Sequence, residues 1–194
     1  MKLIEGKEVT TEHVLGALEL DKTVYSREYW LSESVCKAFA VRNPDIYTML
    51  LDEETGRIAA YLNVSPVSRG FYDSLASGHY VDTVIKAEDI ETPQTNGENL
   101  LYFSSIVVHP NYRRRGLAKQ LLRRYGEKLA DYGAKGVFFD SVIADAVSPS
   151  GEKLCRALGL KNIRSSEHGS SLFERDLRGA NSKDFIYKLM NPNN

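Results

Sequence analysis

The stretch from Leu100 to Leu117 leaves few folds open to this chain. An apolar run, Leu100–Val108, leads through a turn at Pro110 into an Arg/Gly loop. In the residues that follow, 117–132, apolar side chains recur at three- and four-residue steps, which is typical of a helix that buries one face. A run of nine residues in which only Ser104 and Ser105 are polar is typical of a buried strand. Strand, loop and helix in this order predict a layered α/β fold.

The rest of the chain extends this pattern with capping and turn signals. Thr10 and Ser32 stand where helices should begin, and Ser148-Pro149 is an N-cap followed by a first-turn proline. The expected helices cover residues 11–18, 32–42, 69–75, 117–132 and 149–158. The expected strands cover residues 46–51, 58–64, 100–108, 136–142, 170–175 and 185–190, with the first two forming a hairpin.

Size and charge exclude several classes of protein. The 194 residues, 42% of them hydrophobic, suit a single domain over 1–194. A net charge of −1 gives no overall basic field, so we expect neither nucleic acid nor membrane as a partner. The first eight residues are too charged for a signal peptide, and we expect a cytoplasmic protein. Cys36 and Cys155 lie far apart in the sequence and form no metal-type cluster.

Positive charge is concentrated where the long helix should begin. Residues 113–124 contain five Arg, one Lys and no acid. Cations at a helix N-terminus oppose the helix dipole unless an anion lies between them, which points to a bound polyphosphate. Alternatively, this is a solvated helix face with arginines paired to distant acids, which suits Arg123 and Arg124. A nucleic-acid surface is a third possibility, although interleaved aromatic residues are missing. The P-loop and dinucleotide fingerprints are absent.

Two blocks of sequence resemble the GNAT superfamily of N-acetyltransferases. That family has a strand ending in Val-x-Pro and then Arg/Gln-x-x-Gly-x-Gly/Ala, and this chain has Val108-His109-Pro110 followed by Arg113-Arg114-Arg115-Gly116-Leu117-Ala118. Residues 148–160 match the family's second block in spacing and helix placement, although not in every signature side chain. The resemblance implies a mixed, splayed central sheet flanked by helices. The coenzyme core would span about 99–161, with a variable acceptor-side insert at about 66–98.

The resemblance also implies acetyl-CoA, or another acyl-CoA, as co-substrate and no metal. Backbone N–H groups of residues 114–118 would hold the pyrophosphate, and the edge of residues 106–108 would bind the pantetheine arm. The thioester would lie where this strand separates from residues 136–142. The implied coenzyme-binding residues are Ile106, Val107, Val108, Arg113, Arg114, Arg115, Gly116, Leu117, Ala118, Lys119 and Ser148.

The groups that would move protons are less clearly marked. Cys155 stands where many family members place a Tyr that protonates the departing thiolate, so it is either a general acid or a small buried packing residue. Ser104 and Ser105 occupy the strand region where the family often has a carboxylate. Glu98 and Asp140 are the alternative candidates for a general base, and each could equally be a structural acid.

These observations predict an enzyme that transfers an acetyl group from acetyl-CoA to a primary amine by direct attack. The alternative is a CoA-binding sensor or structural module with reduced catalysis. Residues 66–98 contain six acidic and two basic residues, which favours a cationic acceptor, either a small molecule or a protein amine. The same segment could be a solvated surface loop. We expect a monomer or a homodimer.

Overall fold

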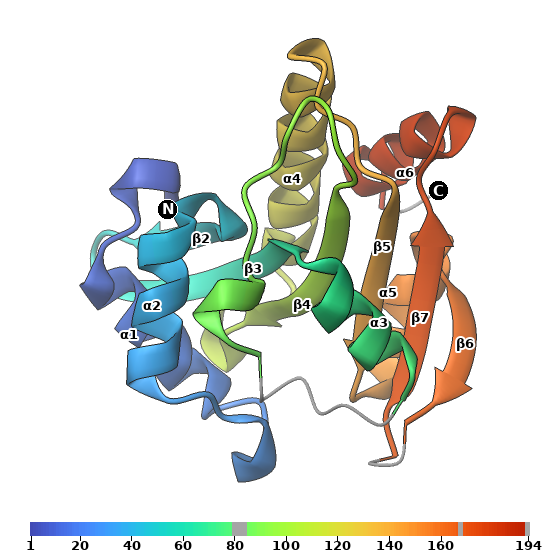
Figure 1. Cartoon of the computed structure of the whole chain (residues 1–194). Coiled ribbons are helices and arrows are strands. Elements are labelled where there is room, and N and C mark those ends of the chain that lie inside the picture. The colour runs from blue at the N-terminus through green and yellow to red at the C-terminus, as the bar shows by residue number, and fades with distance from the viewer. Residues whose placement is uncertain (79–84, 167–168, 193–194) are drawn as a thin grey trace.

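A mixed seven-stranded sheet forms the centre of the computed structural model, which describes residues 1–78, 85–166 and 169–192. The strand order is β1-β2-β3-β4-β5-β7-β6 (Figure 1). Strands β4 and β5 pair in parallel and the other neighbours are antiparallel. The strands are β1 (Lys2–Glu5), β2 (Tyr47–Asp52), β3 (Arg57–Val67), β4 (Leu100–Val108), β5 (Ser141–Ala146), β6 (Lys161–Ser165) and β7 (Ser171–Asp176).

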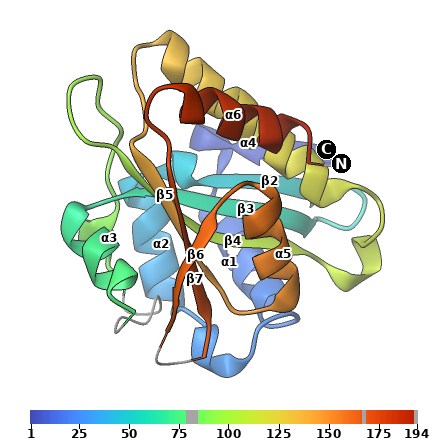
Figure 2. The same cartoon turned by 90° about the vertical axis from the view of Figure 1, so that its right-hand side faces the viewer.

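Helices cover both faces of the sheet (Figures 1 and 2). They are α1 (Thr11–Asp21), α2 (Glu33–Arg42), α3 (Arg69–Ala76), α4 (Leu117–Ala134), α5 (Pro149–Ala157) and α6 (Ala180–Met190). The buried apolar side chains of α1, α2 and α3 form one cluster with the sheet, and those of α4, α5 and α6 form another. The predicted α/β class, with a mixed sheet between helices, is confirmed.

The capping signals act as expected. The side chains of Thr10 and Ser32 accept backbone N–H groups of α1 and α2, and Ser148 does the same for α5. Each oxygen satisfies one of the N–H groups that a helix start leaves without an intrahelical partner.

The sheet opens in its middle. Pairing between β4 and β5 ends at Phe103 and Ala144, whereas β4 continues along β3 as far as Val108. Ser104 is an extra residue in β4, because Phe103 faces Val64 and Ser105 faces Asn63. A bulge of this kind bends and twists a strand. The second half of β4 therefore keeps β3 as its neighbour and leaves an edge open toward β5.

Several predicted elements were wrong. Residues 185–190 belong to the helix α6 and not to a strand. Strand β5 begins at Ser141 and not at residue 136; before it, Val137 and Phe139 are buried side chains of a loop. Two strands, β1 and β6, were not predicted. Helix α4 also continues past Gly133 to Ala134, and the left-handed residue after it is Gly136.

The 66–98 segment is partly structural. Its helix α3 buries Phe71, Tyr72 and Leu75 against the sheet, and Ile90 is fully buried. It is therefore more than a solvated loop over its described part. None of the helices in the described ranges has the length and apolar composition that a membrane span requires.

Candidate active site

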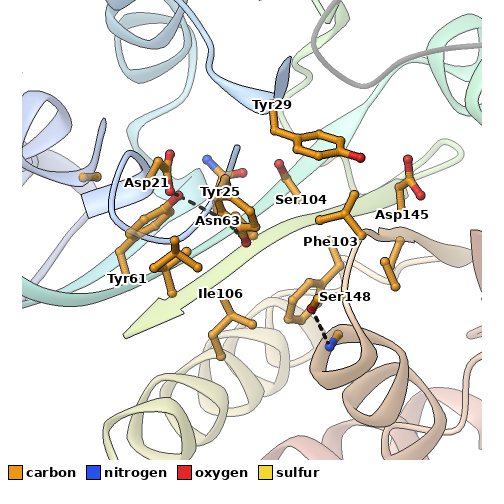
Figure 3. Close-up of a pocket in the computed structure, with 18 of the residues that line it drawn as sticks. Asp21, Tyr25, Tyr29, Tyr61, Asn63, Phe103, Ser104, Ile106, Asp145 and Ser148 are labelled. Atoms are coloured by element: carbon orange, nitrogen blue, oxygen red, sulfur yellow. Dashed lines mark hydrogen bonds between the residues drawn. The ribbon is translucent and has the colours of Figure 1, made fainter. Parts of the chain in front are cut away.

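A pocket of about 940 Å³ passes through the opening in the sheet. Its lining comes from both halves of the chain: the end of α1, strand β3, the second half of β4, the start of α4 and the first turns of α5. Figure 3 shows that side chains on opposite sides of β4 point into it. The pocket thus joins the basic loop on one face of the sheet to the α1 side on the other.

At the loop end, the backbone takes an unusual course before α4 begins. Gly116, the N-cap of α4, has a φ of +76° and Arg114 has a φ of +63°. Positive φ is uncommon for a residue other than glycine and marks stored backbone strain, which concentrates at functional sites. A Cβ built on Gly116 meets nothing within 4 Å among the described residues, so the space above the loop is open. The loop can therefore receive a ligand at the helix N-terminus.

The charges around this loop are exposed. Arg113, Arg114, Arg115 and Lys119 are on the surface, and no ion pair joins any of them to an acid within the described part of the chain. Arg124 behaves differently, because it pairs with Glu5 and with Glu127. For Arg124 the alternative interpretation as a paired surface arginine is therefore confirmed.

The tip of the β2–β3 hairpin supports the loop from below. The Tyr112 hydroxyl donates to Asp52, and Thr55 donates to the same carboxylate at 2.9 Å. The guanidinium carbon of Arg115 lies 5.2 Å from the centre of the Tyr112 ring, within the range of a cation–π contact. The tyrosine hydrogen bond also lowers the pKa of Asp52. This arrangement fixes the direction in which Arg115 leaves the backbone.

Most residues predicted for the coenzyme side come together here. Ile106, Val107 and Val108 line the pocket from the open edge of β4. Arg113, Ala118 and Ser148 also line it, while Arg114, Arg115, Gly116, Leu117 and Lys119 lie in the adjoining loop and first helical turn. Ser148 Oγ accepts the backbone N–H of Gly151 at 3.1 Å, so its role as an N-cap is visible directly.

Cys155 lines the same half of the pocket from α5. Burial raises the pKa of its thiol to about 12, well above that of a free cysteine. The thiol therefore holds its proton tightly at neutral pH, which favours the packing role over that of an acid or nucleophile.

Glu98 and Asp140 lie outside the pocket residues. Both precede strands at the end of the sheet where β4 and β5 are still paired, whereas the opening is at the other end of β4. Glu98 forms an exposed ion pair with Arg69, and Asp140 accepts the backbone N–H of Asn99 at 2.9 Å. Both carboxylates thus have structural partners, and the geometry gives no support to their predicted catalytic roles.

The other half of the pocket holds a carboxylate that the sequence did not single out. Asp21, the last residue of α1, accepts a hydrogen bond from the Tyr61 hydroxyl of β3. That hydroxyl lies 3.1 Å from Ser105 Oγ, which is 3.1 Å from the Tyr25 hydroxyl. Asp21 is therefore connected through Tyr61 to Ser105, the residue next to the bulge in β4.

Burial raises the pKa of Asp21 from 3.8 to about 6, and the Tyr61 hydrogen bond opposes this rise in part. The pair is separated by 40 residues in the sequence and meets only in the folded protein. A sequence pattern at the end of an amphipathic helix gives no signal of such a contact.

Charge in the pocket is divided between its two halves. Of the described lining residues, only Arg113 on the loop side is basic, and only Asp21 and Asp145 are acidic. Asp21, Tyr25 and Tyr61 gather at one end of the view in Figure 3, Asp145 lies at the other, and Tyr29 and Ser104 lie between them. The α1 side is thus aromatic and acidic and suits a cationic group, whereas the loop side suits an anion. Over residues 1–78, 85–166 and 169–192, no cluster of His, Cys, Asp or Glu is placed to hold a metal ion.

The same fold occurs in solved structures of diverse activity. The loading GNATL domain of CurA from Lyngbya majuscula has a TM-score of 0.65 at 11% identity, covering 91% of this chain and 98% of its own. The NatC complex bound to Gag peptide and CoA has a TM-score of 0.58 at 15% identity, covering 90% of this chain and 96% of its own. A mosquito arylalkylamine N-acetyltransferase like 5b has a TM-score of 0.54 at 13% identity, covering 91% of this chain and 99% of its own. A splayed α/β sheet of the GNAT type is therefore the class to which this fold belongs.

The sequence places the chain within that class. The Acetyltransferase (GNAT) family matches residues 13–148, and the chain belongs to this family. A comparison with curated proteins gives no significant match.

Proposed function

We propose that the protein is an N-acetyltransferase that moves the acetyl group of acetyl-CoA to a primary amine. The observation that carries this proposal is the pocket itself, because it connects the basic loop to an acidic, aromatic chamber through the opening between β4 and β5. Membership of the GNAT family supports the same assignment.

The loop side fits the coenzyme. The N-terminus of α4, with the open space above Gly116 and the cations Arg113 and Arg115, suits a pyrophosphate. The unpaired edge of β4 at residues 106–108 offers backbone groups to an amide-containing arm, as a neighbouring strand would. Structural neighbours solved with CoA or with an acyl-CoA support this use of the loop.

The α1 side fits the amine. A protonated amine entering the pocket meets Asp21 and the ring faces of Tyr25 and Tyr29, all of which favour a cation. Two acids of the 66–98 segment, which the sequence suggested for this purpose, have another partner: Asp73 and Glu98 pair with Arg69. We therefore assign recognition of the amine to Asp21 and not to Asp73 or Glu98.

The chain's residues then favour direct transfer without an acyl-enzyme. Both cysteines are buried, and burial raises the pKa of each to about 12, so neither is an activated nucleophile. The acceptor nitrogen can reach the carbonyl carbon from the α1 side while a backbone N–H on the open β4 edge faces the developing oxyanion.

The test is turnover with a panel of amines: 1,4-diaminobutane, phenethylamine and a peptide with a free α-amino group. We expect the protein with acetyl-CoA to release CoA thiol only when an amine is present, with one acetylated amine per thiol by mass spectrometry. N-acetylphenethylamine is the matched control and should give no release.

A different result would favour the alternative. If acetyl-CoA binds but no amine in the panel provokes thiol release, the protein is better described as a CoA-binding sensor or structural module. A lasting acetyl adduct on the protein would contradict direct transfer.

A further inference from the structure

We infer that Asp21 is the general base that takes the proton from the acceptor amine, with Tyr61, Ser105 and Tyr25 as its hydrogen-bonded relay. This inference rests on the proposed function, because it assigns a role within that reaction. The geometry that carries it is the chain of contacts from the Asp21 carboxylate to the strand at which the pocket opens.

The position of Asp21 is the first argument. It lines the pocket from the end of α1, on the side of the sheet away from the basic loop. The Tyr61 hydroxyl, which donates to Asp21, also lies within hydrogen-bond distance of Ser105, the neighbour of the bulge residue Ser104. An amine held against Asp21 therefore faces the place where β4 leaves β5.

The surroundings of Asp21 are the second argument. The titratable groups that interact with it are Tyr61 on β3, Tyr47 on β2 and Cys36 on α2. Burial raises the pKa of all three, so each is neutral at neutral pH. No ion pair to Asp21 occurs within the described residues. The carboxylate therefore lacks a positive partner, and a protonated amine would supply it.

The proton affinity of Asp21 is also appropriate. With its pKa raised by burial to about 6, the carboxylate is mostly ionised at neutral pH yet more basic than an exposed aspartate. A catalytic base works best when its pKa lies near the operating pH. Burial keeps the Tyr61 hydroxyl protonated, so Tyr61 remains a donor to the carboxylate.

The reaction moves two protons and one acetyl group. An ammonium proton passes to Asp21, which becomes a neutral acid, and the amine nitrogen gains a free lone pair. That pair forms a C–N bond to the thioester carbonyl carbon, and the C–S bond then breaks with its electrons on sulfur. A second N–H proton passes to the thiolate, giving the amide and CoA thiol. Asp21 returns its proton to solvent through the hydroxyls of Tyr61, Ser105 and Tyr25, of which Tyr25 is only half buried.

The experiment measures kcat/KM against pH for the wild type, Asp21→Asn and Tyr61→Phe with the three amines named above. In the wild type we expect kcat/KM to rise through pH 6 as Asp21 ionises. Asp21→Asn should lower it by about 10²- to 10⁴-fold and remove this rise, while Asp21→Glu restores part of the rate. The matched control is Glu19→Gln, an exposed acid on the same helix, which should match the wild type.

Tyr61→Phe separates a catalytic base from a structural acid. The Tyr61 hydrogen bond lowers the pKa of Asp21. Its loss should therefore move the rise in kcat/KM to higher pH. If kcat/KM of Tyr61→Phe rises at the same pH as in the wild type, the inference is overturned even if the amine is acetylated. An Asp21→Asn variant as active as the wild type overturns it as well. A wild type that acetylates no amine overturns the proposed function and this role together. If Asp21→Asn does not fold, the pH dependence of kcat/KM in Tyr61→Phe decides whether Asp21 is the base.

Discussion

A single carboxylate is held where it weakens the fold. Asp21 is a half-buried acid at the C-terminal end of α1, a helix end that itself disfavours negative charge. In the described part of the chain, the Tyr61 hydrogen bond is the contact that favours the ionised form of Asp21. Residues of this kind exchange stability for function, because an ionised group that the fold does not neutralise is available to a ligand.

The stability of the Asp21→Asn variant tests this at the same residue. The folded-state pKa is raised from 3.8 to about 6, so the contribution of Asp21 to stability is fully present below pH 4 and is lost as pH rises through 6. The neutral amide should therefore make the protein more stable than the wild type at pH 8, by up to about 3 kcal/mol, and the gain should vanish near pH 4.

Urea unfolding at both pH values measures this difference. Glu19→Gln serves again as the control and should show no such pH dependence, because Glu19 is exposed. An Asp21→Asn variant that is less stable than the wild type at pH 8 would show that the carboxylate is a structural group.

Among the elements, the prediction from sequence succeeded where local signals are strong. The sequence predicts strand β4 with its observed bounds, and α4 to within two residues, because a largely apolar run and a clear helical period need no tertiary information. Strand β6 was not predicted, because all of its residues are exposed and its sequence shows no alternation of apolar and polar residues. The basic loop was located from sequence, whereas Asp21 was not, since its partners come from distant strands.

Helix α6 shows why a short apolar run is ambiguous. Its end, Phe185 to Met190, is rich in aromatic and branched residues, as a strand would be. The structure favours a helix because Phe185 and Leu189, four residues apart, both become buried beside α4. Gly126 of α4 permits this close packing: a Cβ there would lie 2.8 Å from Met190 Cγ and 3.2 Å from Leu189 Cβ.

The packing of these two helices gives a prediction at the element scale. Gly126→Ala should destabilise the protein by about 1–3 kcal/mol, because the added methyl overpacks the contact with α6. Gly133→Ala is the matched change on the same helix, where, among the residues that the structure describes, a Cβ would meet only Phe138, at an ordinary 3.7 Å. That variant should gain up to about 1 kcal/mol from helix propensity. Equal effects of the two substitutions in thermal unfolding would contradict the assigned packing.

On the scale of the whole molecule, the sheet separates the basic side of the pocket from its acidic, aromatic side, and the two sides meet at one opening. Helices α4 and α5 bring the basic loop and the proposed coenzyme side of the pocket to one face, while α1 brings Asp21 to the other. The bulge at Ser104 is what connects them, because it ends the β4–β5 pairing. The proposed reaction depends above all on the loop being a site for acyl-CoA.

Thermal unfolding with acetyl-CoA tests that point most directly, in the wild type, Gly116→Val and Gly136→Val. Both glycines are left-handed, with φ of +76° and +77°, and a Cβ on either meets nothing within 4 Å in the described structure. The two variants therefore carry similar backbone strain, and only Gly116 lies in the loop. At 100 times Kd we predict that acetyl-CoA raises the Tm of the wild type and Gly136→Val by about 5–10 °C, and leaves Gly116→Val almost unshifted. A wild-type Tm that stays unmoved at millimolar acetyl-CoA would contradict the account.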